Sequence, residues 1–293
     1  MPKSPSPDSK SGRNRAEGWK YAKNSGHSHE DYVASRLRSD LTFANNLSIS
    51  CFNMKLGQPA VSGGGASATH VKDVFDKRTN GKPDLYVEWP ANRVVRISLK
   101  KSTGGQVFLT SVERFVAGFE KQFRVQVPTK VKAGLDLFIG GDSKRIHQLM
   151  KNKEYCGPIH RRTGASQEEH QNRLVGKTLE KFFPSEWVAT LDWFKDNIGE
   201  IAEFAFARGY ASEESDFASH VWYLGVEPNS KRNLVVPISK IKTGSARLKN
   251  EVNVGERNGG STIHLPFGFL QMHAPKSENL MQFHHSFKKI ESL

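Results

Sequence analysis

The sequence predicts an α/β (α+β) fold in which helices flank a mixed central β-sheet. Residues 84–89 and 93–101 alternate polar and apolar side chains, the pattern of two neighbouring half-buried strands. Residues 112–123 instead place apolar side chains at helical intervals. Up to residue 141, the predicted elements follow the order helix, strand, strand, strand, helix, strand.

The N-terminal residues 1–27 are rich in Ser, Pro, Lys and Arg and carry few apolar side chains. Such a segment cannot offset the entropy cost of ordering, so we expect a disordered basic tail. No later stretch has the composition of a linker, and residues 28–293 are therefore expected to form a single domain. Within it we predict a core at 28–141 and further helices and strands at 142–293.

The first helix is expected to start at the capping pair Ser28 and Asp31 and to end near Asn45. A strand at 48–54, a loop of small residues at 57–69 and a brief helix at 69–76 are predicted to follow.

The strands 84–89 and 93–101 are predicted to be joined by a turn at Pro90-Ala91-Asn92. If Trp89 pairs with Val94, the antiparallel register sets Asp84 opposite Leu99.

The next predicted helix has the capping-box spacing Thr110-x-x-Glu113, and the apolar run 135–140 is predicted to be the last core strand. Beyond the core, Ser166 and Glu169 form a second capping box, and Pro184 is expected to open a helix that ends at Gly209. The last predicted strands are 221–226, 233–238, 262–265 and 267–272.

The charge of the chain indicates a polyanionic partner. Lys and Arg number 43 against 30 Asp and Glu, giving a formal charge of +13 and a pI of about 9.7. Nucleic acid is the commonest such partner, and a basic protein that binds none is the alternative. Only two cysteines occur, without a C-x-x-C pair, and no run of 18 apolar residues is present. We therefore expect a cytoplasmic protein that does not cross a membrane.

The polar residues of the predicted hairpin suggest the chemistry. Pro83-Asp84, followed by a strand and then by Ser98-Leu99-Lys100, resembles the motif of the PD-(D/E)XK nuclease superfamily, especially its type II restriction endonucleases. The predicted order of elements in residues 28–141 is similar to the common core of that superfamily. The resemblance implies a restriction-endonuclease-like core and Mg²⁺-dependent, site-specific hydrolysis of double-stranded DNA in a prokaryotic cytoplasm.

One position departs from the family pattern, because Ser98 stands where the second acid is expected. Some restriction enzymes of the superfamily carry that acid on the following helix, and Glu113 resembles this arrangement. Mg²⁺ prefers carboxylate oxygens and water, so Asp84 and Glu113 are the predicted metal ligands. Lys100 is predicted to orient or help deprotonate the attacking water and to stabilise negative charge. Asp84 and Glu113 also have plain structural interpretations, as a strand start and a capping residue.

Three further side chains are accessory candidates. Gln106 follows two glycines and can contact phosphate or water, Glu30 resembles an acid that some family members place on the first helix, and Glu88 shares a strand face with Asp84. A solvated surface position is the alternative for Glu30, and Glu88 is the substitute second acid. His160, His170 and Asn172 do not have HNH-nuclease spacing, and His284-His285 lacks a nearby ligand partner in the sequence.

The resemblance implies a homodimer or higher homo-oligomer on symmetric duplex sites. Residues suited to phosphates or guanine edges are Lys101, Lys240, Lys242, Arg247, Lys249 and Arg257, with Lys231 and Arg232 nearby. Two other functions remain open: a non-catalytic DNA-binding protein in which Ser98 marks a decayed site, and a repair or nonspecific nuclease.

Overall fold

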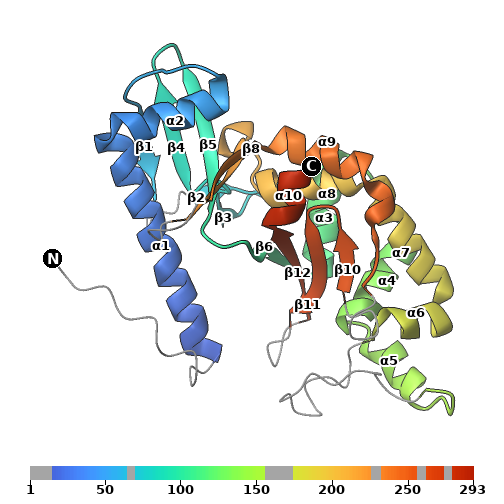
Figure 1. Cartoon of the computed structure of the whole chain (residues 1–293). Helices are drawn as coiled ribbons and strands as arrows, with labels where there is room; N and C mark the ends of the chain where they lie inside the picture. Colours follow the sequence, from blue (N-terminus) through green and yellow to red (C-terminus); the bar gives the residue numbers. More distant parts are fainter. Residues whose placement is uncertain (1–14, 65–69, 156–173, 226–231, 256–261, 274–278) are drawn as a thin grey trace.

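The computed structural model describes residues 15–64, 70–155, 174–225, 232–255, 262–273 and 279–293. These residues form two five-stranded sheets, a separate two-stranded hairpin and the helices around them (Figure 1). Among them, no helix is both long and apolar enough to cross a lipid bilayer. The mixed α/β class predicted from the sequence is confirmed.

The first sheet has the strand order β1-β4-β5-β7-β8, with β1 Ala60–Gly63, β4 Leu85–Trp89, β5 Arg93–Lys100, β7 His220–Leu224 and β8 Asn233–Pro237. Only the β5–β7 pair is parallel, so the sheet is mixed. The helices α1 (Arg15–Ser39) and α2 (Leu41–Phe52) bury their apolar side chains against this sheet; the packed residues include Val33, Leu37, Phe43, Leu47, Val87, Trp89, Ile97 and Trp222.

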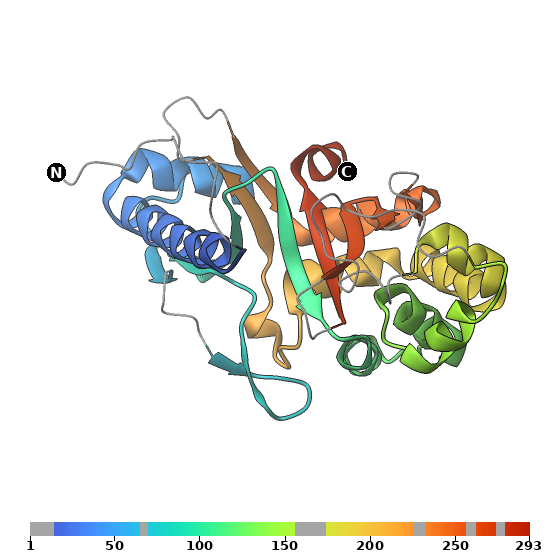
Figure 2. The same ribbon diagram turned by 90° about the horizontal axis from the view of Figure 1, so that it is seen from below.

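The second sheet is antiparallel, with the order β6-β12-β11-β10-β9. Its strands are β6 Gly104–Thr110, β12 Leu280–Ser286, β11 Gly268–His273, β10 Thr262–Leu265 and β9 Asn253–Val254. A larger hydrophobic core joins this sheet to helices, among them α3 Val112–Phe123, α4 Thr129–Ile139, α7 Pro184–Asp196, α8 Ile198–Glu203 and α9 Ile238–Arg247. The remaining α-helices are α5 Ser143–Met150, α6 Gly176–Phe182 and α10 Phe287–Ser292. Figure 2 shows that α1 and α2 lie at the opposite end of the molecule from α4 to α7.

The prediction of a strand at 135–140 is wrong. Residues 135–139 form the second half of α4, where Leu135, Leu137 and Phe138 are all buried. A short apolar run has the same appearance in a buried strand and in a helix that is covered on several sides. Gly140, with φ +79°, ends the helix. The parallel partner of β5 is consequently supplied about 120 residues later in the chain.

The N-terminal predictions also need correction. Residues 48–54, predicted as a strand, belong largely to α2, whose N-cap is Asp40 accepting a hydrogen bond from the Phe43 N–H. Ser28 and Asp31 lie inside α1, which begins at Arg15, within the expected tail. The brief helix predicted at 69–76 is replaced by the hairpin strands β2 His70–Lys72 and β3 Arg78–Asn80. The helices therefore extend beyond both predicted ends, before Ser28 and after Asn45.

In the C-terminal half, the strands predicted at 221–226, 233–238, 262–265 and 267–272 match β7, β8, β10 and β11 closely. The predicted helix from Pro184 is interrupted at Asn197, after which α8 continues into a π-helical turn, Phe204–Arg208. Gly209 ends it as predicted, with φ +53°. The predicted capping box at Ser166 and Glu169 lies outside the described residues.

Candidate active site

The hairpin of β4 and β5 brings three candidate residues together. The register pairs Leu85 with Ile97, which sets Asp84 across from Ser98, one position from the predicted pairing with Leu99. Asp84 Oδ2 accepts hydrogen bonds from the Leu99 N–H at 2.7 Å and from Ser98 Oγ at 3.4 Å. Lys100 Nζ donates to Ser98 Oγ at 2.6 Å and to the Leu99 carbonyl at 3.1 Å. The Ser98 hydroxyl therefore links the carboxylate to the ammonium group.

The sequence explains this local geometry. Ala91 and Asn92 adopt φ of +64° and +55°, the left-handed pair that a tight hairpin turn requires. Leu85 and Val87 of β4 turn into the core beneath α1 and α2, so the alternation of the strand places Asp84 on the other face. That face is turned towards the junction with the second sheet, where β5 ends and β6 begins.

Lys82 is a site residue that the sequence did not indicate. Its Nζ donates to the carbonyls of Val107 at 3.1 Å and Ala205 at 2.6 Å, and lies 4.4 Å from the ring centroid of Phe108. Burial, and then the charge of Lys100, lower the pKa of Lys82 to about 7, while Asp84 acts in the opposite direction. This lysine ties the segment that leads into Asp84 to β6 and the π-helical turn.

Asp84 is half-buried, and this burial raises the pKa of its carboxyl group. Lys100, the Leu99 N–H, Lys82 and the Ser98 hydroxyl act in the opposite direction and favour the carboxylate. The hydrogen bonds that Asp84 accepts from described residues both reach Oδ2, and none of them involves Oδ1.

Asp84 fits a magnesium site of the kind that uses few protein ligands. The described part of the chain contains no group of three or more His, Cys, Asp or Glu side chains arranged for a metal. Mg²⁺ commonly binds through one or two carboxylates, with water and substrate phosphate completing its coordination. The geometry thus suits an ion held jointly by the protein and a phosphate ligand.

Behind Lys100 lies a buried pair that the sequence also missed. Tyr223 stands in register with Lys100 on the parallel neighbour β7, and its hydroxyl is 2.9 Å from His285 Nδ1. Burial, and then Lys100 and His284, lower the pKa of His285 to about 3. Because His285 lies 185 positions after Lys100 in the sequence, only the pairing of β12 with β6 brings the two together.

Glu113 makes no hydrogen bond with Asp84, Ser98 or Lys100. It is exposed in the first turn of α3, in a recess of about 590 Å³ lined by Asp73, Phe75, Lys77, Arg78, Ser111, Glu113 and Arg114. It is absent from the charges that act on Asp84, whereas it does act on Asp136 of α4. The helix is capped by Ser111, which accepts from the Arg114 N–H, so the predicted capping box starting at Thr110 is wrong. The metal-binding role of Glu113 stays a prediction.

Backbone contacts bring the segment of α1 that carries Glu30 close to the Asp84 backbone, and the acidic side chain nearest to Gly64 is that of Asp31. The Gly64 N–H donates to the Asp84 carbonyl at 2.8 Å, and a Cβ built on Gly64 would lie 3.6 Å from the Glu30 carbonyl carbon and 3.4 Å from Asp31 Oδ1. Glu88 is exposed on the face shared with Asp84, but four strand residues separate them by about 13 Å, too far to share one ion. Gln106 is exposed on β6, where its side chain accepts from Gln282 at 2.8 Å.

Comparisons with known proteins address the fold. No protein-family model matches the chain, and no curated protein matches it by sequence. The crystal structure of the restriction endonuclease MspI in complex with its cognate DNA is similar, with a TM-score of 0.50 and 11% sequence identity. The similarity covers 93% of this chain and 99% of that chain. This is a restriction-endonuclease fold. At such low identity the comparison extends to the fold alone, and the chemistry depends on the side chains.

Four of the eight basic residues singled out from the sequence contact other residues of the chain, among them Arg232, which donates to the Lys101 carbonyl at 3.2 Å. Lys242 pairs with Glu203 at 2.6 Å, Lys249 with Asp196 at 3.3 Å, and Arg247 donates to the Leu293 carbonyl at 3.1 Å. Lys101 and Lys240 are exposed. Arg257, Lys231, His160, His170 and Asn172 lie outside the described residues.

Proposed function

We propose that this protein is a Mg²⁺-dependent endonuclease that hydrolyses phosphodiester bonds of double-stranded DNA at specific sites, as type II restriction enzymes do. The observation that carries the proposal is the linked Asp84, Ser98 and Lys100 on a hairpin of the restriction-endonuclease fold. The formal charge of +13 suits a polyanionic substrate. The solved complex of MspI with DNA adds support for DNA as the partner.

Each residue has a defined part in this mechanism. Asp84 and a second acid would hold the ion, and Mg²⁺, when bound, would supply positive charge that neutralises the phosphate in the transition state. Lys100 Nζ, held by Ser98 Oγ, orients the attacking water and stabilises charge on the phosphate oxygens. Lys82 fixes the segment that carries Asp84 and adds positive charge behind its carboxylate.

Two residues are proposed for the second acid. Glu113 is proposed from the relocated-acid pattern of the superfamily. Glu30 is proposed because α1 passes against Gly64, which is hydrogen-bonded to the Asp84 backbone. The two acids lie on different elements, so single substitutions separate them.

The test is incubation of supercoiled plasmid with the full chain, with Mg²⁺ and with chelator. We expect discrete fragments with Mg²⁺, no cleavage with chelator, and loss of cleavage in Asp84→Asn and Lys100→Ala. Lys144→Ala removes an exposed charge from α5 and serves as the control. A smear in place of fixed fragments would favour a nonspecific or repair nuclease, and sequencing the fragment ends would identify the recognition site.

A non-catalytic DNA-binding protein is the second candidate function. It is favoured by the single carboxylate among the contacts of the described site, since a decayed nuclease keeps its fold and loses its ligands. A mobility shift without cleavage at any Mg²⁺ concentration would support it. The proposed homodimer is tested separately by light scattering, where a monomer mass with and without DNA would exclude it.

A further inference from the structure

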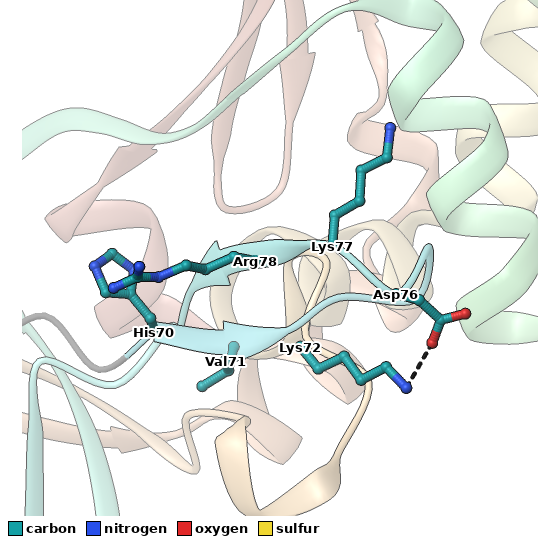
Figure 3. Close-up of a pocket in the computed structure, with 6 residues that line it drawn as sticks. All are labelled: His70, Val71, Lys72, Asp76, Lys77 and Arg78. Carbon is teal, nitrogen blue, oxygen red and sulfur yellow. Dashed lines mark ion pairs between the residues drawn. The ribbon is translucent and has the colours of Figure 1, made fainter.

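The β2–β3 hairpin presents one face to solvent and the other to the protein. Its register pairs His70 with Asn80 and Lys72 with Arg78, so these four side chains share a face. All four are exposed, whereas Val71 on the opposite face is buried. Figure 3 shows Lys77 extending from the turn of the hairpin.

Two of the hairpin's cations are available to a ligand. Lys72 is paired with Asp76 at 2.7 Å, and Figure 3 marks this ion pair. Lys77 and Arg78 are exposed and form no ion pair with any residue that the structure describes. Both also line the recess that contains Glu113, in which Arg114 is paired with Asp73 at 3.3 Å. With Asp73 and Arg114 paired, the recess keeps two cations, Lys77 and Arg78, against one acid, Glu113, and is therefore positively charged.

The hairpin is held in a fixed position. Buried Asp73 accepts from the N–H groups of Phe75 and Lys77, both at 2.8 Å, and pairs with Arg114 of α3. The Val74 N–H donates to the Tyr210 carbonyl at 2.9 Å, and Lys121 Nζ donates to the Val74 carbonyl at 2.9 Å. A cationic element that is already ordered loses little entropy when it binds.

The hairpin is also connected directly to the candidate active site. The strand β3 ends at Asn80, and the chain continues through Lys82 to Asp84. Six residues separate Arg78 from Asp84, a reach of at most about 20 Å in an extended chain. Along a DNA strand, phosphates follow one another about every 3.4 Å of helix axis, so this reach corresponds to about six nucleotides.

We propose that the β2–β3 hairpin grips the phosphate backbone of duplex DNA beside the scissile phosphate, with Lys77 and Arg78 as its contacts. This inference rests on the proposed function, which supplies DNA as the ligand. It adds an element that holds the substrate, packed against α3. The hairpin positions the duplex through charge and contributes no group to the reaction.

The experiment measures binding of a labelled duplex to the full chain in chelator, over a series of salt concentrations. Lys77→Ala/Arg78→Ala should lower the log–log salt slope by about 2, since each phosphate contact contributes about 0.9. Lys144→Ala/Lys151→Ala removes the same charge from α5 and its C-cap, at the lower right of Figure 1, and should leave the slope unchanged.

Several outcomes would overturn the hairpin's role while leaving the proposed function intact. These are an unchanged slope in the hairpin variant, an equal loss in the α5 control, or a loss confined to one DNA sequence, which would indicate base reading. The pair Lys77→Gln/Arg78→Gln repeats the test with side chains of similar size. If the wild-type protein binds no duplex and cleaves none, the proposed function itself fails.

Discussion

The two sheets contribute to the site in different ways. The first sheet carries the proposed catalytic residues, because Asp84, Ser98 and Lys100 come from one of its hairpins and are linked by hydrogen bonds. The second sheet supplies support, because β6 accepts a hydrogen bond from Lys82 and β12 places His285 behind Lys100. Changes in the first sheet should therefore affect cleavage, and changes at the junction with the second should affect stability as well.

The largest expected effect is the loss of cleavage in Asp84→Asn and Lys100→Ala. Each variant removes a charged group that the proposed mechanism places on the reacting phosphate or its ion, so we expect a rate loss of about 10²–10³-fold. Single-turnover cleavage measures it, and duplex binding in chelator is the control. Near-wild-type rates in both variants would show that the linked hairpin residues are not the catalytic group.

The second acid provides the next largest effect. Loss of a metal-binding carboxylate should lower cleavage at limiting Mg²⁺ by about 10–100-fold and be partly restored by excess Mg²⁺. We expect this behaviour in Glu30→Gln, because α1 contacts the backbone partner of Asp84. The same behaviour in Glu113→Gln alone would assign the second metal-binding acid to α3. An element that packs against the second sheet would then take part in metal binding.

The sequence predicted the first sheet's hairpin because its determinants are local. The turn at Ala91 and Asn92 and the alternating burial of Leu85 and Val87 fix the register to within one residue. The predicted register set Asp84 opposite Leu99, and the structure sets it opposite Ser98, one residue away. Local pattern was sufficient for this hairpin, whereas the three-residue strands β2 and β3, although adjacent in sequence, were missed because residues 69–76 were predicted as a helix.

The parts that failed depend on distant segments. The parallel partner of β5 is β7, about 120 residues later, and no property of the apolar run 135–140 distinguishes it from a core strand. Similarly, Lys82 lies beside its acceptor Ala205 only after the whole chain has folded. The residues of the site that were missed are those whose neighbours come from the other sheet.

Substitutions at Lys82 test how the segment that leads into Asp84 is held against β6 and the π-helical turn. Lys82→Met keeps most of the buried stem but leaves the Val107 and Ala205 carbonyls without their donor, which should lower the free energy of unfolding by about 2–3 kcal/mol. Urea denaturation measures this change, and cleavage should fall with it because Asp84 is less well fixed. Gly209→Ala should act in the same direction, since its Cβ would lie 2.9 Å from Lys82 Cε at a φ of +53°. Unchanged stability in both variants would show that the hydrogen bonds of Lys82 do not stabilise the contact between the two sheets.

The last expected effect concerns stability alone, which should fall in acid because two histidines are buried in the neutral form. Burial lowers the pKa of His285 to about 3 and that of His220 to about 4, from an ordinary value of 6.5. Between pH 6 and 4.5 the unfolded chain therefore takes up protons that the folded protein does not. The contribution of the two neutral histidines to the free energy of unfolding is complete above pH 6.5. It falls as the pH is lowered, by about 1.4 kcal/mol per pH unit for each histidine.

A substitution at the buried site should remove part of this slope. His285→Gln should flatten the pH dependence of unfolding in that window by the share of one histidine, whereas His147→Gln, on the exposed surface of α5, should leave it unchanged. Urea denaturation at several pH values measures both. An equal slope in His285→Gln and wild type would mean that His285 is already protonated in the folded protein over this pH range. The side chain that lies behind Lys100 would then be a charged histidine and not a neutral one.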